Sequence, residues 1–307
     1  MNCANLAIQS ILFEVVEMFI PNQLLKALNN DRCVVLIGSG LSSRLFLRLG
    51  KRYPNWTELL QMYSEYSFQQ DIITHQEQEL VDDVISKGNL TIAAQILMDK
   101  SNDLDFSTFL ESVFNNGNQF DHIHCQIWDL PFSFVLTTNY DSILENAYSY
   151  KYNKSIPTYT NKLLSNVNKS ISEHKNFLFK LHGSYEQSDT IIFTQNDYKK
   201  LYFNSAYIDT LKNIFINYSV LFIGFSYNDP DISSIVSSLA HEFNSGSQMH
   251  YLLCPNNIYN NLEKEYFKTK ERITIIEYDN TDNSHSGVED FFKELSSRTK
   301  KRHCNNP

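Results

Sequence analysis

Four short motifs hold the polar residues with which this chain could do chemistry. They read GSGLS at 38–42, TTNYD at 137–141, KLHG at 180–183 and IGFSYNDPDI at 223–232. Each motif stands at the end of an apolar run of strand length. In open α/β sheets, ligands bind in the crevice outside the carboxyl ends of the strands. The four motifs together therefore predict one shared ligand site.

The first motif is a glycine turn, Gly38-Ser39-Gly40, of a kind that lets a backbone approach a phosphate closely. Ser42 and Ser43 add hydroxyl donors. Because position 43 is Ser, the motif is not a complete G-x-G-x-x-G. An acidic residue closing a second strand about 20 residues further on is also missing. Taken alone, the turn fits a nucleotide site and a plain strand–helix connection about equally well.

The other motifs offer candidate contact residues, each with a structural alternative. Asn139 and Asp141 follow a strand-like run and are candidates for ligand contact, although both residue types are also good helix N-caps. His182, with a glycine beside it, has room for a ligand; it is either a catalytic group or a structural histidine. Gly224 and Ser226 are predicted to face the same crevice.

The elements that must position these motifs alternate between apolar runs and helical patterns. Because most of the apolar runs lack polar alternation, they read as parallel strands buried on both faces. This order predicts an α/β fold with a doubly wound, mostly parallel Rossmann-like sheet. Strands are expected at 32–38, 133–138, 177–181, 190–193, 219–224, 249–254 and 273–278, and helices at 141–150, 195–216, 229–243, 257–268 and 286–297.

A second feature interrupts that alternation: residues of about 56–130 carry several helical patterns in succession and no clear strand. We interpret them as a helical module inserted after the first strand, since five helices are too many for one crossover. The chain is expected to be a single domain, 1–307, with an amphipathic N-terminal helix at about 1–20 and a basic tail at 298–307. Glu14 and Glu17 interrupt the N-terminal apolar stretch, which argues against a signal peptide.

Charge and cysteine content exclude several classes of protein. The formal net charge of −9 argues against a general nucleic-acid binder, but it leaves small anions possible at a backbone turn. The five cysteines include no C-x-x-C pair and are odd in number. They indicate reduced thiols in a cytoplasmic protein, without a zinc site or a disulfide framework. No run is long enough to span a membrane.

In this combination and order, the four motifs resemble the sirtuin-like domain of bacterial antiphage NADases. The stretches YPNWTELL at 53–60 and IIFTQNDYKKLY at 191–202 share the resemblance, which covers residues of about 30–280. It implies that Asn139 positions a water or the nicotinamide ribose, that Asp141 reads the nicotinamide carboxamide and that His182 is catalytic. It also implies that NAD+ is held by Gly38, Ser39, Gly40, Ser42 and Thr138, with Gly224 and Ser226 on the adenosine side.

Two departures from protein-deacylating sirtuins sharpen the expected activity. This chain lacks their four-cysteine zinc module, and it reads SRLFLRLGKRYPNW at 43–56 where they carry a GIPDFR-like stretch. The expected function is therefore that of an NAD+ glycohydrolase (NADase). It would release nicotinamide and ADP-ribose and deplete NAD in antiphage, abortive-infection defence. The alternatives are a non-catalytic NAD or ADP-ribose-binding regulatory subunit and, disfavoured by the missing zinc module, an NAD-dependent protein deacylase.

The resemblance also implies partners. NAD+ is expected as the substrate, with no further cofactor and no zinc. A homo-oligomer is expected. Because no sensor domain is evident after the sirtuin-like region, a protein partner encoded nearby is expected, of the hexameric ATPase or short Argonaute type. Direct binding to nucleic acid or membrane is not expected.

Overall fold

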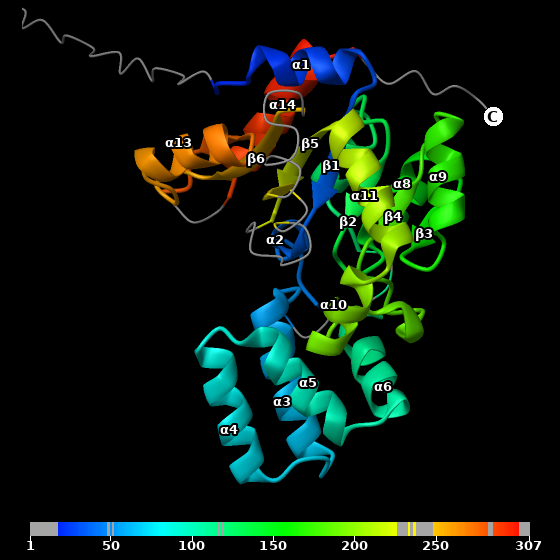
Figure 1. Cartoon of the computed structure of the whole chain (residues 1–307), viewed down its shortest axis with the longest axis vertical. Coiled ribbons are helices and arrows are strands. Elements are labelled where there is room, and N and C mark those ends of the chain that lie inside the picture. The colour runs from blue at the N-terminus through cyan, green and yellow to red at the C-terminus, as the bar shows by residue number, and fades with distance from the viewer. Residues whose placement is uncertain are drawn as a thin grey trace, which may run out of the picture.

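The computed structural model describes residues 18–47, 50, 52–115, 117, 119–225, 233, 236–237, 248–281 and 285–300. At its centre is a seven-stranded sheet of order β3-β4-β2-β1-β5-β6-β7, in which every pair of neighbours is parallel (Figure 1). This confirms the expected doubly wound α/β fold. Most of the expected helices at 1–20 and 229–243, and most of the tail at 298–307, lie outside the described residues.

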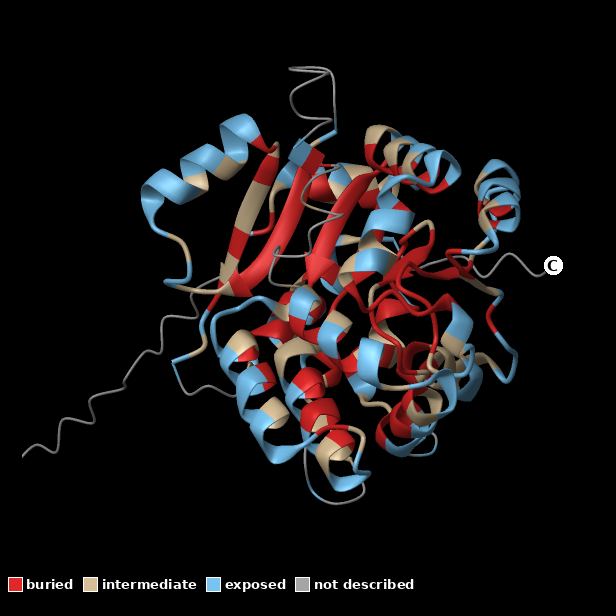
Figure 2. Cartoon of the chain, turned by 60° about the horizontal axis from the view of Figure 1, so that its bottom comes forward, coloured by how far each residue is buried: buried red, intermediate tan, exposed pale blue. Residues whose placement is uncertain are grey.

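The sheet is buried on both faces because helices cover both. Along β1, Cys33, Val35 and Ile37 pack into one apolar core, while Val34 and Leu36 pack into the other. Figure 2 shows the central strands as buried between helices with exposed outer faces. The strands are β1 Cys33–Ile37, β2 Val135–Thr137, β3 Thr158–Thr160, β4 Leu178–Lys180, β5 Ser219–Ile223, β6 His250–Pro255 and β7 Ile273–Tyr278.

The first core lies under α1, α7, α8 and α14, and the second lies under α9 and α11. The expected helix at 195–216 is two helices, because the Asn204 side chain accepts from the Tyr207 N–H and starts a new one. In the described chain none of the helices is sufficiently long and apolar to cross a lipid bilayer. The helices around the sheet are α1 Asn22–Asn29, α2 Ser39–Ser42, α8 Ile143–Tyr152, α9 Leu164–Ser172, α10 Gln195–Tyr202, α11 Ser205–Asn217, α13 Asn261–Lys270 and α14 Gly287–Arg298.

After the short helix α2, five longer helices follow one another before β2 in the described chain. Four of them enclose an apolar core of their own at the carboxyl ends of the strands (Figure 1), whereas α7 packs into the first sheet core. Capping boxes at Asn55 with Glu58 and at Thr74 with Glu77 start two of these helices by pairing free N–H groups. The five are α3 Trp56–Gln69, α4 His75–Ser86, α5 Leu90–Lys100, α6 Asp103–Phe114 and α7 His122–Ile127.

One strand prediction was wrong, and one strand was not predicted. The run at 190–193 is not a strand but the end of a short 3₁₀ turn, Ser188–Thr190, followed by irregular chain. Its apolar side chains are buried because Ile191 and Phe193 pack into the helical core and Ile192 into the second sheet core. The edge strand β3 was missed because its sequence, TYT, has no apolar run and is only partly buried.

Candidate functional site

The strand register brings the four polar motifs to one edge of the sheet. Ile37 on β1 pairs with Thr137 on β2 and with Ile223 on β5, and Thr137 in turn pairs with Lys180 on β4. These four residues form one row across four adjacent strands. Asn139 and His182 therefore each lie two residues beyond paired positions on neighbouring strands. Gly38 and Gly224 each lie one residue beyond theirs, at the switch point between β1 and β5 where a doubly wound sheet binds ligands.

The two glycine turns at this switch point are packed directly against each other. The Gly38 N–H donates to Ile223 O and the Gly40 N–H donates to Gly224 O, each at 2.9 Å. A Cβ on Gly38 would lie 2.3 Å from Gly224 O, and Gly224 itself has a φ of +63° that favours glycine. The glycines thus let the turns meet, and the amides of Gly38 and Gly40 are already paired. The third predicted contact residue of the turn at 38–40, Ser39, is partly buried.

Ser42 joins the first motif to the second through two short hydrogen bonds. Its hydroxyl donates to Asp141 Oδ2 at 2.8 Å and accepts from Asn139 Nδ2 at 2.9 Å. All three side chains are less than a tenth exposed. Asp141 Oδ1 also accepts from the N–H of Ile143, the first residue of α8, although the N-cap position of that helix is Ser142 and not Asp141. Thr138 sits beside this cluster and donates its N–H to Ile37 O.

His182 is buried at the end of the third motif. Its ring meets the Tyr198 ring edge-on at 5.5 Å between centroids, and its carbonyl accepts from the Ile192 N–H. The Tyr140 hydroxyl donates to Ile192 O at 2.7 Å. The segment at 190–193, which was predicted as a strand, therefore forms hydrogen bonds with both the second and the third motif. Ser226, the remaining predicted contact, lies outside the described residues.

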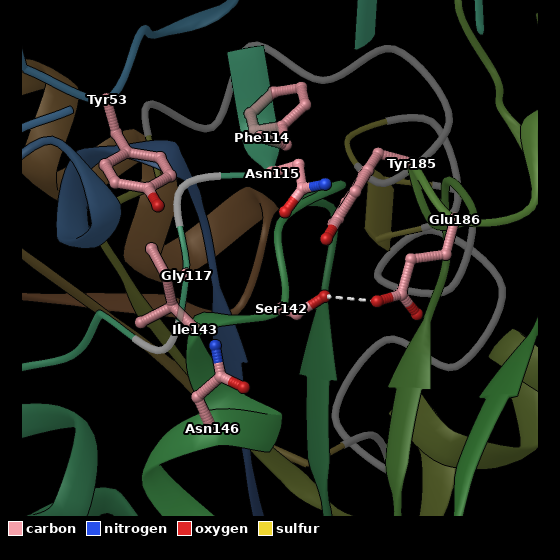
Figure 3. Close-up of a pocket in the computed structure, with 9 residues that line it drawn as sticks. All are labelled: Tyr53, Phe114, Asn115, Gly117, Ser142, Ile143, Asn146, Tyr185 and Glu186. Carbon is pink, nitrogen blue, oxygen red and sulfur yellow. Dashed lines mark hydrogen bonds between the residues drawn. The ribbon is translucent and has the colours of Figure 1, made fainter. Parts of the chain in front are cut away.

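A polar cavity of about 240 Å³ lies beside Asp141, between the helical core and the start of α8 (Figure 3). Ser142 donates to Glu186 Oε1 across its wall at 3.4 Å. Such a volume accepts a group the size of one aromatic ring rather than a whole dinucleotide. The cavity is lined by Tyr53, Phe114, Asn115, Gly117, Ser142, Ile143, Asn146, Tyr185 and Glu186.

The two tyrosines of this cavity are hydrogen-bond donors at neutral pH. Burial, helped by the negative charge of Asp141, raises the pKa of Tyr53 to about 12. Burial also raises the pKa of Tyr185. Neither tyrosine was predicted as a contact residue, because the two come from loops far apart in the chain, although Tyr53 opens the YPNWTELL stretch.

Sequence reasoning also passed over Lys180, which is completely buried at the end of β4. Its signal was visible in FLFKLHG, where a lysine interrupts an apolar strand. A buried ammonium needs paired partners, so such a lysine marks a polar interaction inside the fold. As for metal ions, the described part of the chain contains no group of three or more His, Cys, Asp or Glu residues able to hold one.

Comparisons with known proteins agree with this geometry. Residues 133–276 match the model of the SIR2-like domain family. The chain is 26% identical over 258 residues to "NAD(+) hydrolase ThsA" of Enterococcus faecium, an alignment that covers 80% of this chain and 48% of that protein. The protein of the same name from Acinetobacter baumannii is 25% identical over 245 residues, an alignment that covers 79% of this chain and 46% of that protein.

A third relative is the "Defense-associated sirtuin 2" of Bacillus subtilis, 22% identical over 217 residues, which cover 68% of this chain and 19% of that protein. The chain spans about half the length of the NAD(+) hydrolases it matches and a smaller share of this third relative.

Proposed function

Because residues 133–276 match the SIR2-like domain family, we propose that the chain is a sirtuin-like NAD+ glycohydrolase. The reaction would cleave the bond between nicotinamide and ribose, with water as the acceptor, to give nicotinamide, ADP-ribose and a proton. The names of the related hydrolases support this substrate. Because they are about twice as long as this chain, the activity is proposed for it on the strength of its own site.

The observation that supports the proposal is the pairing of Thr137 on β2 with Lys180 on β4, because Asn139 and His182 each follow two residues after these paired positions. An amide and an imidazole at neighbouring strand ends suit the handling of one water molecule. A site that only bound NAD+ would not need this pair, since glycine turns and hydroxyls suffice for binding.

In the proposed reaction, nicotinamide is already a good leaving group and needs no proton from the protein. The ribose passes through an oxocarbenium-like state, as in glycoside hydrolysis. Asn139 would orient the ribose or the attacking water. A nitrogen of His182 would take the proton from that water as its oxygen bonds to the anomeric carbon and the carbon–nitrogen bond breaks. General-base catalysis of this kind contributes about 10²–10⁴-fold.

The Ser42 cluster supports the binding part of the proposal. Asp141 would hold the nicotinamide carboxamide, and its hydrogen bond from Ser42 keeps the carboxylate in one orientation. The low exposure of Ser42, Asn139, Asp141 and His182 suits a reaction that must exclude all water except the attacking molecule. The turns around Gly38 and Gly224 would flank the phosphates and the adenosine side.

The direct test is nicotinamide release from NAD+ by the purified chain, compared with Asn139→Ala and His182→Ala. We expect each variant to lose at least about 10²-fold in kcat. The control is His75→Ala, which replaces an exposed histidine on α4 and should retain full activity.

Equal rates in wild type and both variants would refute the proposal. Calorimetry showing NAD+ binding without cleavage would instead indicate a regulatory NAD-binding subunit. Release of deacylated peptide that depends on NAD+ would indicate a deacylase.

We extend the proposal to antiphage defence, in which NAD+ is depleted in the infected cell, supported by the name of the Bacillus subtilis relative. Cytoplasmic location is proposed with it, supported by the free thiols of Cys33, Cys125 and Cys254. Cellular NAD+ measured after phage challenge, with His182→Ala as the control, tests the role. A decline in wild-type cells alone is the expected result.

Organisation and assembly are proposed on the same footing. We treat residues 1–307 as one sirtuin-like domain with an inserted helical module. Assembly as a homo-oligomer with a partner of the hexameric ATPase or short Argonaute type is also part of the proposal. Light scattering of the purified chain tests self-association, and a clean monomer would contradict it. Co-purification with the product of the neighbouring gene tests the partner.

A further inference from the structure

Lys180 is a fully buried cation for which the proposed reaction has no use. It is the last residue of β4, two positions before His182. A charge in an apolar core is strongly unfavourable unless every donor is paired. The partners of its ammonium group therefore show what the residue does.

All three partners of the Lys180 ammonium belong to the segment after β2. Its Nζ donates to Asp141 O at 2.5 Å, to Tyr140 O at 3.3 Å and to Glu145 Oε1 at 2.9 Å. Two of these acceptors are main-chain carbonyls in the TTNYD motif, and the third is a carboxylate in the first turn of α8. The three donors of the ammonium group match these three acceptors.

The loop held in this way carries the residues proposed to handle the substrate. Asn139 directly precedes Tyr140, and the Asp141 side chain bonds Ser42 while its carbonyl bonds Lys180. The Lys180 side chain thus connects the end of β4, two residues before His182, to the loop that presents Asn139 and Asp141. The distance between the two proposed reacting groups depends on this connection.

Glu145 completes the arrangement by balancing the buried charge. Its Oε1 pairs with Lys180, whereas Oε2 is buried without a hydrogen-bond partner among the described residues. Burial raises the pKa of Glu145, and the neighbouring ammonium group opposes that rise. Removing Lys180 alone would leave this carboxyl and the Asp141 carbonyl without their donor in the core, while the Tyr140 carbonyl keeps its bond from the Tyr185 N–H.

We propose that Lys180 is a positioning residue, which fixes the loop carrying Asn139 and Asp141 relative to His182 through the carbonyls of Tyr140 and Asp141. The inference rests on the proposed NAD+ hydrolysis for its catalytic consequence. Its structural content, an ammonium group that bonds two carbonyls of this loop, stands independently of that reaction.

The test separates positioning from stability with two variants. Lys180→Met keeps the stem but removes the ammonium group, and it should also destabilise the fold because Glu145 is left unpaired. Lys180→Met combined with Glu145→Met removes both charges, so its melting temperature should return toward wild type. In both proteins the Asp141 carbonyl is left without its donor, and the Tyr140 carbonyl keeps only its bond from the Tyr185 N–H.

We expect kcat and kcat/KM for nicotinamide release to fall together by about 10²-fold in both variants, as for a misplacement of about 1 Å. Hydrogen–deuterium exchange of residues 137–146 should accelerate about tenfold in both, with residues 33–37 unchanged in the double variant. The matched control is Lys151→Met. Lys151 is a partly exposed lysine in the last turn of α8, and it pairs with Asp129. It should behave as wild type in both assays.

A double variant with wild-type kcat and wild-type exchange at 137–146 overturns the proposal. Recovery of kcat together with the melting temperature also overturns it, because Lys180 would then act through stability alone. If the wild-type protein cleaves no NAD+, the proposed function fails, and the exchange measurement still decides whether Lys180 holds the loop.

Discussion

Replacing Gly38 by alanine tests whether the two glycine turns at the switch point must touch. The new Cβ would lie 2.3 Å from Gly224 O and 3.0 Å from both Gly224 C and Phe225 Cα. Every one of these atoms is backbone, so no side chain can rotate away. Ordinary contact begins at 3.4 Å. The turns must therefore separate by about 1 Å.

The cost of that separation follows from the bonds between the turns. The Gly38 N–H to Ile223 O and Gly40 N–H to Gly224 O bonds, both 2.9 Å, would stretch beyond hydrogen-bonding distance. Two lost bonds at about 1 kcal/mol each, with about 1–3 kcal/mol for overpacking, outweigh the gain of about 0.4–1 kcal/mol from a stiffer unfolded chain. We expect a net loss of about 3 kcal/mol. For a protein of this size that lowers Tm by about 6 °C.

Gly40→Ala is the matched control. Its Cβ would approach Gly224 Cα and Gly224 O only to 3.0 Å, a conflict that a few tenths of an ångström relieves. Gly40 lies within α2, where alanine gains up to about 1 kcal/mol over glycine. We expect this variant to stay within about 1 kcal/mol of wild type.

The assay is thermal and urea unfolding followed by circular dichroism, with nicotinamide release measured on the folded proteins. A Gly38→Ala protein that melts within about 2 °C of wild type would refute the argument. So would a Gly40→Ala protein that is the less stable of the two.

Three further predictions concern stability and thiol chemistry. Burial lowers the pKa of His250 from 6.5 to about 3, and its neutral Nδ1 accepts from the Val220 N–H, so the native state binds fewer protons than the unfolded chain. The contribution of His250 to the free energy of unfolding should be complete above pH 6.5 and should fall as the pH drops from 6.5 toward 3. In urea titrations at several pH values, His250→Asn should flatten this pH dependence, and the exposed control His75→Asn should not. Asn55→Ala removes the cap of α3 and should lower the free energy of unfolding by about 1 kcal/mol, measured by urea denaturation; no loss would show that the capping box is dispensable. Burial raises the pKa of Cys254 to about 12, so Cys254→Ser should leave the number of thiols that react with Ellman's reagent in the native protein at pH 8 unchanged, and a decrease by one would contradict its burial.

The sheet was largely predictable because its strands are short apolar runs that must be buried on both faces. Six of the seven expected strands are present, and the alternation of strand and helix was sufficient for the doubly wound order. The run at 190–193 misled because burial alone does not distinguish a strand from an irregular segment between two cores. The edge strand at 158–160 escaped for the opposite reason, since an edge needs little apolar side-chain area.

The candidate site was also predictable in part: its residues were, and the contacts between them were not. Ser42, Asn139, Asp141 and His182 were predicted from their positions at strand ends, and the register sets them along one edge. The direct bond from Ser42 to Asp141 was not predictable, because 99 residues separate the two in sequence. The grouping of Tyr53, Tyr185 and Glu186 around the cavity was not predictable either, because these residues come from loops far apart in the sequence.

Local sequence patterns identified six of the seven parallel strands and the residue types at their ends, because hydrophobic periodicity and turn chemistry are local properties. How those ends meet depends on the tertiary fold. The glycines of GSG allow the close contact with Gly224 in addition to any contact with a ligand. Lys180 donates a hydrogen bond to the Asp141 carbonyl in the neighbouring loop. Contacts of this kind depend on strand order and register, which arise when distant segments pair and which no local pattern encodes.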